Sequence, residues 1–136
     1  MRYLDLAGEA IKKDEGLVLK PYKCSAGKLS IGYGRNLEDR GIDKEEAEFL
    51  FNTDIKTVDN QLKILLSEVF NTLSDKRKAI LVNMGFNLGV YGLLKFKKMI
   101  KALECADFET ASLEMLDSRW AKQVGNRAKR LSNEMK

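Results

Sequence analysis

The sequence contains no histidine, and this absence excludes several classes of enzyme. Ser-His-Asp and Cys-His catalysis both need an imidazole, as does every histidine-ligated metal site. The two cysteines, Cys24 and Cys105, are too far apart to form a CxxC zinc or redox motif. We therefore expect no metal and no cofactor. An enzyme of this composition has to move protons mainly through carboxylates, helped by Tyr, Lys or Cys.

Long apolar runs are also absent, since none approaches the roughly 20 residues that a membrane span needs. The first residues carry a charge every few positions, so we expect neither a signal peptide nor a signal anchor. The chain is therefore expected in the cytoplasm, where both cysteines are reduced. A net charge of +4 and a pI near 9.0 fit an anionic partner: nucleic acid, a membrane surface or a cell-wall polymer. Charge alone does not choose among them.

Proline is scarce, and the single one lies in an unusual stretch, residues 14–34. This stretch also holds four of the ten glycines and an acidic pair, Asp14 and Glu15. Leu17–Tyr22 and Lys28–Tyr33 alternate in polarity, which predicts two strands joined by a loop at Gly27. Pro21 marks a sheet edge or a bulge, and Gly32 and Gly34 indicate a close backbone approach or a sharp bend. A small β element with a carboxylate at its mouth is where we expect chemistry.

Everything else in the chain has helical periodicity. A capping box, Asp43 with Glu46, predicts the start of a long helix from Lys44 to about Ser67. The other expected helices cover residues 2–13, Asp75–Leu88, Leu93–Leu103, Phe108–Leu116 and Asn126 to about Met135, with a short basic segment, Ser118–Lys122, around the only tryptophan. The fold class is α+β in a single domain over residues 1–136. We expect a small β lobe (15–43), a connecting long helix (44–67) and a helical lobe (1–14 and 68–136).

Four blocks of sequence, in order along almost the whole chain, match one known family. They are Asp14-Glu15-Gly16 with Tyr22, Gly27 and Ile31-Gly32-Tyr33-Gly34; Glu46-Ala47-Glu48 with Leu50-Phe51-Asn52 and Asp54; Asn83-Met84 with Phe86-Asn87 and Gly89; and Ser118-Arg119-Trp120 with Asn126-Arg127-Ala128-Lys129-Arg130. In these blocks the sequence resembles the phage-type lysozymes, the endolysin family of glycoside hydrolases that includes the T-even phage lysozyme. One such block would be weak support, but four in register are specific.

The resemblance implies a muramidase with two lobes joined by a long helix and a substrate cleft between them. Members cleave the β-1,4 bond between N-acetylmuramic acid and N-acetylglucosamine in peptidoglycan and so lyse the bacterial host. The implied partner is peptidoglycan, not nucleic acid, and the protein is expected to be a monomer without a stable membrane span. It would accumulate in the host cytoplasm until a holin allows its release to the periplasm and cell wall.

Glu15 matches the family's catalytic glutamate. Glycosidic cleavage needs a general acid to protonate the leaving oxygen. At a helix end that faces the sheet, partial burial would raise the pKa of this carboxyl group. Cys24 and Ser30 keep the family spacing, but they stand where the family usually has aspartate and threonine. Ser30 keeps a hydroxyl that can hold a water.

Cys24 can replace the aspartate only as a thiolate, either as a base toward water or as a nucleophile. A nearby Glu15 charge would raise the pKa of the thiol, and arginines in the cleft would lower it. We predict that Cys24 is catalytic. The alternative is a small bystander in an enzyme that relies on Glu15 and a water held by Ser30.

Further positions match the family's substrate cleft, several with altered residue types: Arg35, Asn36, Phe86, Asn87, Met99, Glu114, Arg119 and Arg127. Arg35 replaces a histidine that pairs with an aspartate of the long helix, so we expect an ion pair between Arg35 and Asp54. Arg127 matches an arginine that approaches the catalytic glutamate, while Trp120 is expected in the core. The segment from Asn36 to Asp43 is shorter than in the T-even relative, so a small helix should be missing there.

Two other interpretations stay open. One is a catalytically weak relative that binds peptidoglycan or perturbs membranes through its basic C-terminal helix. The other is a basic helical protein that binds nucleic acid, which rests on charge alone.

Overall fold

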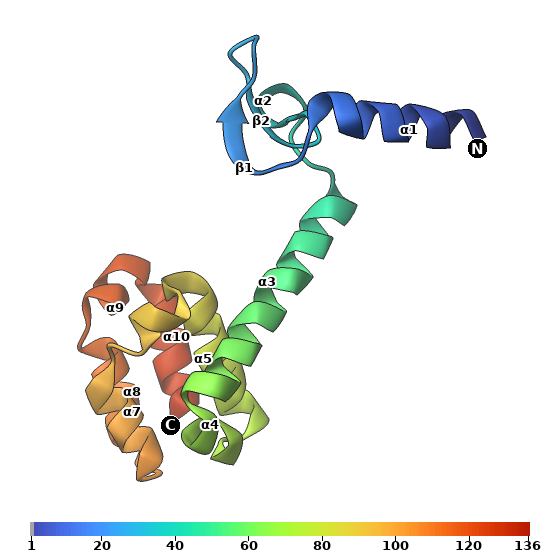
Figure 1. The fold of residues 1–136 in the computed structure, drawn as a ribbon. Helices are drawn as coiled ribbons and strands as arrows, with labels where there is room; N and C mark the ends of the chain where they lie inside the picture. Colours follow the sequence, from blue (N-terminus) through green and yellow to red (C-terminus); the bar gives the residue numbers. More distant parts are fainter. Residues whose placement is uncertain (1) are drawn as a thin grey trace. The chain divides into compact units, whose positions relative to one another are not determined.

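A computed structural model describes residues 2–136 and confirms a mainly helical α+β fold with a small antiparallel sheet (Figure 1). The first elements are α1 (Arg2–Glu15), β1 (Val18–Lys23), β2 (Leu29–Gly32), β3 (Arg35–Asn36), α2 (Leu37–Arg40) and α3 (Lys44–Leu65). Seven further helices follow: α4 (Ser67–Thr72), α5 (Asp75–Leu88), α6 (Val90–Leu93), α7 (Lys97–Glu104), α8 (Phe108–Leu116), α9 (Arg119–Val124) and α10 (Asn126–Met135).

The chain forms two compact units, the first ending at Phe49 and the second beginning at Leu50, so the boundary falls within α3. We call them the N-terminal unit (residues 2–49) and the C-terminal unit (residues 50–136). The assignment of residues 1–14 to the helical lobe, within a single domain, stays a prediction.

The sheet has the strand order β1-β2-β3 with antiparallel pairing, which makes β1 an edge strand. Val18 pairs with Gly32, but the register shifts before Tyr22 pairs with Ser30. Pro21 lies between these two pairs and cannot donate a ladder hydrogen bond. Both features predicted from this proline, an edge strand and a bulge, are confirmed.

The ends of the two helices next to the sheet follow local rules. Gly16 ends α1 with a φ of 71°, and its N–H donates to the Lys12 carbonyl over 2.9 Å. The capping box at the start of α3 is confirmed: Glu46 N–H donates to Asp43 Oδ1 (2.8 Å) and Asp43 N–H to Glu46 Oε1 (2.9 Å). These two helix ends fix where the chain enters and leaves the β region.

The later helices are confirmed at their caps but not everywhere between them. Ser74 and Asp107 each accept a main-chain N–H at the predicted starts of α5 and α8. Ser118 caps α9 in the same way, although no helix was expected there. The helix expected over Leu93–Leu103 is observed as α7 but begins only at Lys97, and the short helix α6, which ends at Leu93, was not expected. Three-residue turns, from Lys95 N–H to the Gly92 carbonyl and from Phe96 N–H to the Leu93 carbonyl, tighten the chain there.

Two other short helices were not expected either. α4 follows the end of α3 without any glycine or proline signal and buries Val69 and Phe70. The one-turn helix α2 lies between Asn36 and Asp43, where we expected no helix, so that expectation is wrong. Asn36 explains it, since its Oδ1 accepts the Asp39 N–H over 3.0 Å and caps the turn.

The buried apolar core lies entirely in the C-terminal unit. Its members come from α3 through α10: Val58, Leu62, Val69, Phe70, Leu73, Ile80, Leu81, Met84, Val90, Leu93, Met99, Ala102, Leu103, Ala111, Met115, Trp120, Ala128, Leu131 and Met135. Trp120 is only 3% exposed, which confirms its expected place in the core. Among residues 2–49, the one buried side chain is that of Ser30.

Candidate active site

Glu15 is the last residue of α1, and its carboxylate lies against Gly34, after β2. A Cβ at Gly34 would be 2.6 Å from Glu15 Oε2, so any larger residue there would displace the Glu15 carboxylate. Gly34 also has a φ of 74°, a backbone conformation that favours glycine. The close approach predicted from the glycines is confirmed. The Glu15 side chain is exposed, so the partial burial we expected is wrong.

Cys24 begins the loop that follows β1, and main-chain hydrogen bonds close this loop into a tight turn. Cys24 N–H donates to the Lys28 carbonyl (2.9 Å), and Gly27 N–H donates to the Cys24 carbonyl (2.8 Å). Gly27 makes the turn possible with a φ of 77°. The thiol of Cys24 is free and half-buried.

The turn directs hydrogen-bond donors at the Cys24 sulfur. The main-chain N–H of Lys28 has the largest effect and lowers the pKa of the thiol below its ordinary value. The N–H of Ala26 and the Ser30 hydroxyl lower this pKa further, and partial burial opposes them. The Cys24–Lys28 turn therefore favours the thiolate, which is the form that chemistry needs.

Ser30 lies in β2, is 2% exposed and pairs with Asn36 of β3. Its hydroxyl donates to the Lys28 carbonyl over 3.2 Å, and the same group helps to lower the pKa of the Cys24 thiol. A hydroxyl has one proton, so it donates to either the carbonyl or the thiolate at a given moment. The structure thus brings Cys24 and Ser30 together through Lys28, a residue that the sequence analysis did not consider.

Arg35 pairs with Glu46, and the expected partner Asp54 is wrong. Arg35 Nη1 donates to Glu46 Oε1 and to the Gly41 carbonyl, each over 3.0 Å, and Nη2 forms an ion pair with Glu46 Oε2. Glu46 stands in the first turn of α3, whereas Asp54 lies more than two helical turns further along the same helix. The predicted substrate-binding residue Arg35 thus fastens β3 to the start of α3.

Asn36 also has a structural task, as it caps α2 and donates from Nδ2 to Asp39 Oδ2 over 3.0 Å. Its predicted role in substrate binding stays a prediction.

Phe86 and Arg127 come together at a pocket of about 610 Å³ in the C-terminal unit. The Phe86 ring lies 5.6 Å from that of Phe51, centroid to centroid. Arg127 donates from Nε (2.9 Å) and Nη2 (2.7 Å) to Asn83 Oδ1. This bond fixes the direction of the guanidinium within its own unit. The approach of Arg127 to Glu15 stays a prediction.

The remaining candidates are dispersed over the C-terminal unit. Asn87 Oδ1 accepts the Trp120 indole N–H over 2.7 Å, so the amide supports a core residue. Met99 is fully buried, and a half-buried Glu114 borders the same pocket of about 390 Å³. Arg119 is exposed at the first turn of α9. A substrate can reach Asn87 and Arg119 directly, but the sulfur of Met99 is covered.

A model of the family described as Phage lysozyme matches residues 12–135, nearly the whole chain. The chain belongs to the phage lysozyme family. Membership makes it a glycosidase-type enzyme and gives the Glu15 carboxylate its chemical context. None of the helices in residues 2–136 combines the length and apolar character needed to cross a membrane.

Three relatives illustrate the range of this lysozyme family. Probable T4-type lysozyme 2 of Dictyostelium discoideum is 28% identical over 151 aligned residues, covering 90% of this chain and 89% of that protein. The Endolysin of Acyrthosiphon pisum secondary endosymbiont phage 1 is 31% identical over 120 residues, covering 85% of this chain and 77% of that protein. Pre-baseplate central spike protein Gp5 of Enterobacteria phage T4 is 28% identical over 151 residues, but these are only 26% of its length.

Proposed function

We propose that this lysozyme-family protein is an endolysin that hydrolyses the β-1,4 bonds between N-acetylmuramic acid and N-acetylglucosamine in peptidoglycan. The observation that carries this proposal is that the N-terminal unit holds both a carboxylate and a thiol whose thiolate form is favoured. It holds an exposed carboxylate, Glu15, seated against Gly34, and a turn whose amides favour the thiolate of Cys24. An acid and an anionic partner are the two groups that glycoside hydrolysis requires.

In the proposed reaction, Glu15 gives its proton to the glycosidic oxygen as the bond from C1 to that oxygen breaks. Positive charge develops on the sugar ring, and the thiolate of Cys24 stabilises it. Cys24 then either takes a proton from the attacking water or bonds to C1 until water displaces it. Ser30, whose hydroxyl helps to lower the pKa of the Cys24 thiol, stabilises the thiolate through its donated hydrogen bond.

The first test is the lysis of permeabilised Gram-negative cells, followed as loss of turbidity. We expect Glu15→Gln to lose activity by at least about 100-fold, the scale of a general acid. Asp14→Asn is the matched control, because it changes the adjacent carboxylate and should lyse like the parent. If Glu15→Gln lyses as well as the parent, the enzymatic mechanism is wrong.

The role of Cys24 is tested in the same assay. We expect Cys24→Ala to lose most of the activity and Cys24→Asp to keep much of it, because a carboxylate restores the negative charge. Cys105→Ala is the control, since this second free cysteine is exposed and lies outside the N-terminal unit. If Cys24→Ala matches the parent, Cys24 is a bystander.

The alternative, membrane disruption by the basic C-terminal helix, needs a free apolar face on α10. In the structure the apolar face of α10 is not free, because Ala128, Leu131 and Met135 are buried in the core. Binding of nucleic acid rests on net charge alone. We therefore favour the hydrolase, acting as a monomer on peptidoglycan and reaching it from the host cytoplasm through a holin.

A further inference from the structure

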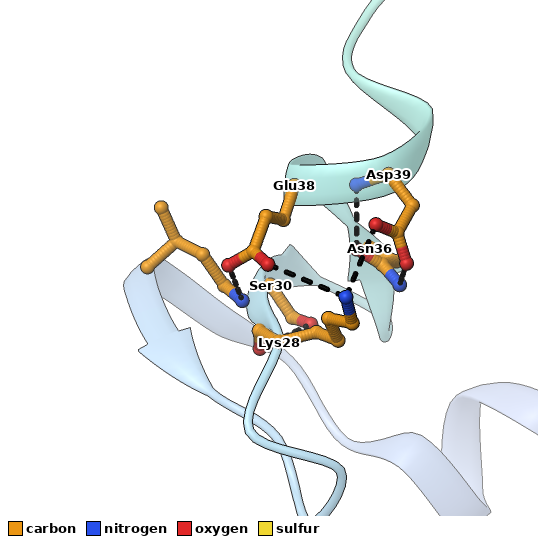
Figure 2. A network of polar contacts seen from close by, with 6 residues as sticks. Lys28, Ser30, Asn36, Glu38 and Asp39 are labelled. Carbon is orange, nitrogen blue, oxygen red and sulfur yellow. Dashed lines mark hydrogen bonds and ion pairs between the residues drawn. The ribbon is translucent and has the colours of Figure 1, made fainter.

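A network of polar contacts joins α2 to the loop between β1 and β2 (Figure 2). The Lys28 ammonium lies 3.5 Å from Glu38 Oε2 and 3.4 Å from Asp39 Oδ1. The other oxygen of Glu38, Oε1, accepts the Leu29 N–H over 3.3 Å. Helix α2 thus contacts the side chain of Lys28 and the main chain of the next residue, Leu29.

The helix that provides these carboxylates is itself fixed to the sheet. Asn36 ends β3, pairs with Ser30 of β2 and caps α2 through Asp39. Figure 2 shows Asn36 and Asp39 facing each other beside the Lys28 ammonium. Because α2 follows β3 directly, Glu38 and Asp39 have a fixed position relative to β2.

Lys28 is the residue on which the thiol environment depends. Its carbonyl accepts the Cys24 N–H (2.9 Å) and the Ser30 hydroxyl (3.2 Å), so it joins both catalytic candidates. Its own N–H is also the largest of the influences that lower the pKa of the Cys24 thiol. A displacement of Lys28 therefore changes the surroundings of Cys24 in several ways at once.

We propose that Glu38, together with Asp39, is a positioning residue for Cys24. By holding Lys28 and Leu29, these carboxylates keep the Cys24–Lys28 turn in the geometry that directs its N–H groups at the sulfur. This proposal rests on the proposed function in that Cys24 matters for hydrolysis. It does not require Glu38 to touch the substrate.

The sign of the effect separates positioning from simple charge. The elements that meet at the turn carry several charged side chains. They are Lys20 and Lys23 of β1, Lys28 of the loop, Arg35 of β3, and Glu38, Asp39 and Arg40 of α2. A carboxylate acting only through space disfavours a thiolate, so its removal would make Cys24 more reactive. Loss of positioning acts the other way, because amides that drift from the sulfur stabilise the thiolate less.

The experiment measures the alkylation of Cys24 by iodoacetamide as a function of pH, since only the thiolate reacts. All variants carry Cys105→Ala, so that Cys24 is the single thiol. We expect Glu38→Ala to be alkylated about threefold more slowly near neutral pH, the scale of a small surface ion-pair network. Glu38→Gln keeps an acceptor for the Leu29 N–H and should stay closer to the parent than Glu38→Ala does.

Two controls keep the result decisive. Glu48→Ala removes an exposed carboxylate of α3 in the same unit and should leave alkylation unchanged. Thermal unfolding followed by circular dichroism shows whether each variant keeps the parent's cooperative transition. If Glu38→Ala has lost it, Asp39→Ala takes its place, with the same slowing expected. Alkylation at the parent's rate or faster in a folded variant overturns the proposal.

Lysis by the same variants distinguishes this proposal from the proposed function. If Cys24→Ala lyses like the parent while Glu38→Ala slows alkylation, the positioning holds and the catalytic role of Cys24 fails. If lysis depends on Cys24 but the alkylation rate is the same in Glu38→Ala and the parent, only the positioning proposal fails.

Discussion

Glu46 serves two partners at once, and one of them is Arg35, for which Asp54 was the expected partner. Its Oε1 accepts both the Asp43 N–H of the capping box and a donor from Arg35, while Oε2 completes the ion pair. The sequence predicted the capping box correctly, because its spacing is local. The partner of Arg35 was instead carried over from the family's histidine–aspartate pair, although a carboxylate such as Glu46 has acceptor sites for several donors.

The Arg35–Glu46 pair should make stability depend on acidity. Hydrogen bonds from Arg35, and then from the Asp43 N–H, lower the pKa of Glu46 from 4.5 to about 2. A lowered pKa means that the stabilisation is fully present above pH 4.5 and is lost as the pH falls toward 2. We expect Glu46→Gln to flatten this part of the pH dependence, measured by urea unfolding at a series of pH values. Glu48→Gln is the control, and an identical decline in Glu46→Gln and the parent would contradict the assignment.

Cys24 shows a second limit of sequence reasoning at the scale of a residue. The expected influences on its thiol were charges, those of Glu15 and of arginines. In the structure the main-chain amides of Lys28 and Ala26 are the leading influences. The directions of main-chain amides depend on the turn conformation, and Gly27 is the one residue of the loop whose type indicates that conformation. The roles of Lys28 and Glu38 could not be predicted either. An ion pair between residues about ten positions apart in irregular chain leaves no periodic pattern in the sequence.

At the scale of elements, the sequence predicted the starts of three helices with side-chain caps, α3 at Asp43, α5 at Ser74 and α8 at Asp107. It did not predict α2 and α9, although these also begin with side-chain caps, Asn36 and Ser118. It failed at Leu66 and at Leu94–Phe96, where the chain bends without glycine or proline. These breaks come from packing, as buried Phe70 after the first and Phe96 against Trp120 after the second show. Packing of this kind cannot be read from a single stretch.

Arg77 connects three helices and should matter more than its charged neighbours. Its Nε donates to the Met135 carbonyl (2.7 Å) and its Nη2 to the Lys136 carbonyl (2.6 Å). Its guanidinium lies 3.5 Å from the centroid of the Phe108 ring. We expect Arg77→Ala to lower the free energy of unfolding by about 2 kcal/mol, because charged hydrogen bonds and the ring contact are lost together.

Lys76→Ala is the matched control for Arg77→Ala, since Lys76 is exposed on the same helix turn. Chemical denaturation of both variants and the parent gives the comparison. Equal stability of the two variants would show that Arg77 does not hold α5, α8 and α10 together.

At the scale of the molecule, the apolar core and the candidate chemistry lie in different units. Among residues 2–136, all buried apolar side chains belong to the C-terminal unit, whereas Glu15, Cys24 and Ser30 belong to the N-terminal unit. The sequence predicted the fold class and the family from four blocks of matching residues. It did not show this separation, because periodicity indicates which face of a helix is apolar but not how completely that face is covered.

This separation predicts a difference in autonomous stability. A fragment of residues 44–136, which keeps α3 whole, should unfold cooperatively because it contains the entire buried apolar core. A fragment of residues 1–43 should stay unfolded, since small domains without a core need disulfides or metals. Thermal scans by circular dichroism test both fragments. A cooperative transition in residues 1–43 would contradict the account.

The central claim is that Glu15 drives hydrolysis of the glycan strand itself. The most direct measurement incubates purified peptidoglycan with the parent and with Glu15→Gln, and then quantifies new reducing ends and identifies the sugar that carries them. The account predicts reducing N-acetylmuramic acid ends from the parent and at least about 100-fold fewer from Glu15→Gln. Equal release by both proteins, or lysis without any new reducing end, would contradict it.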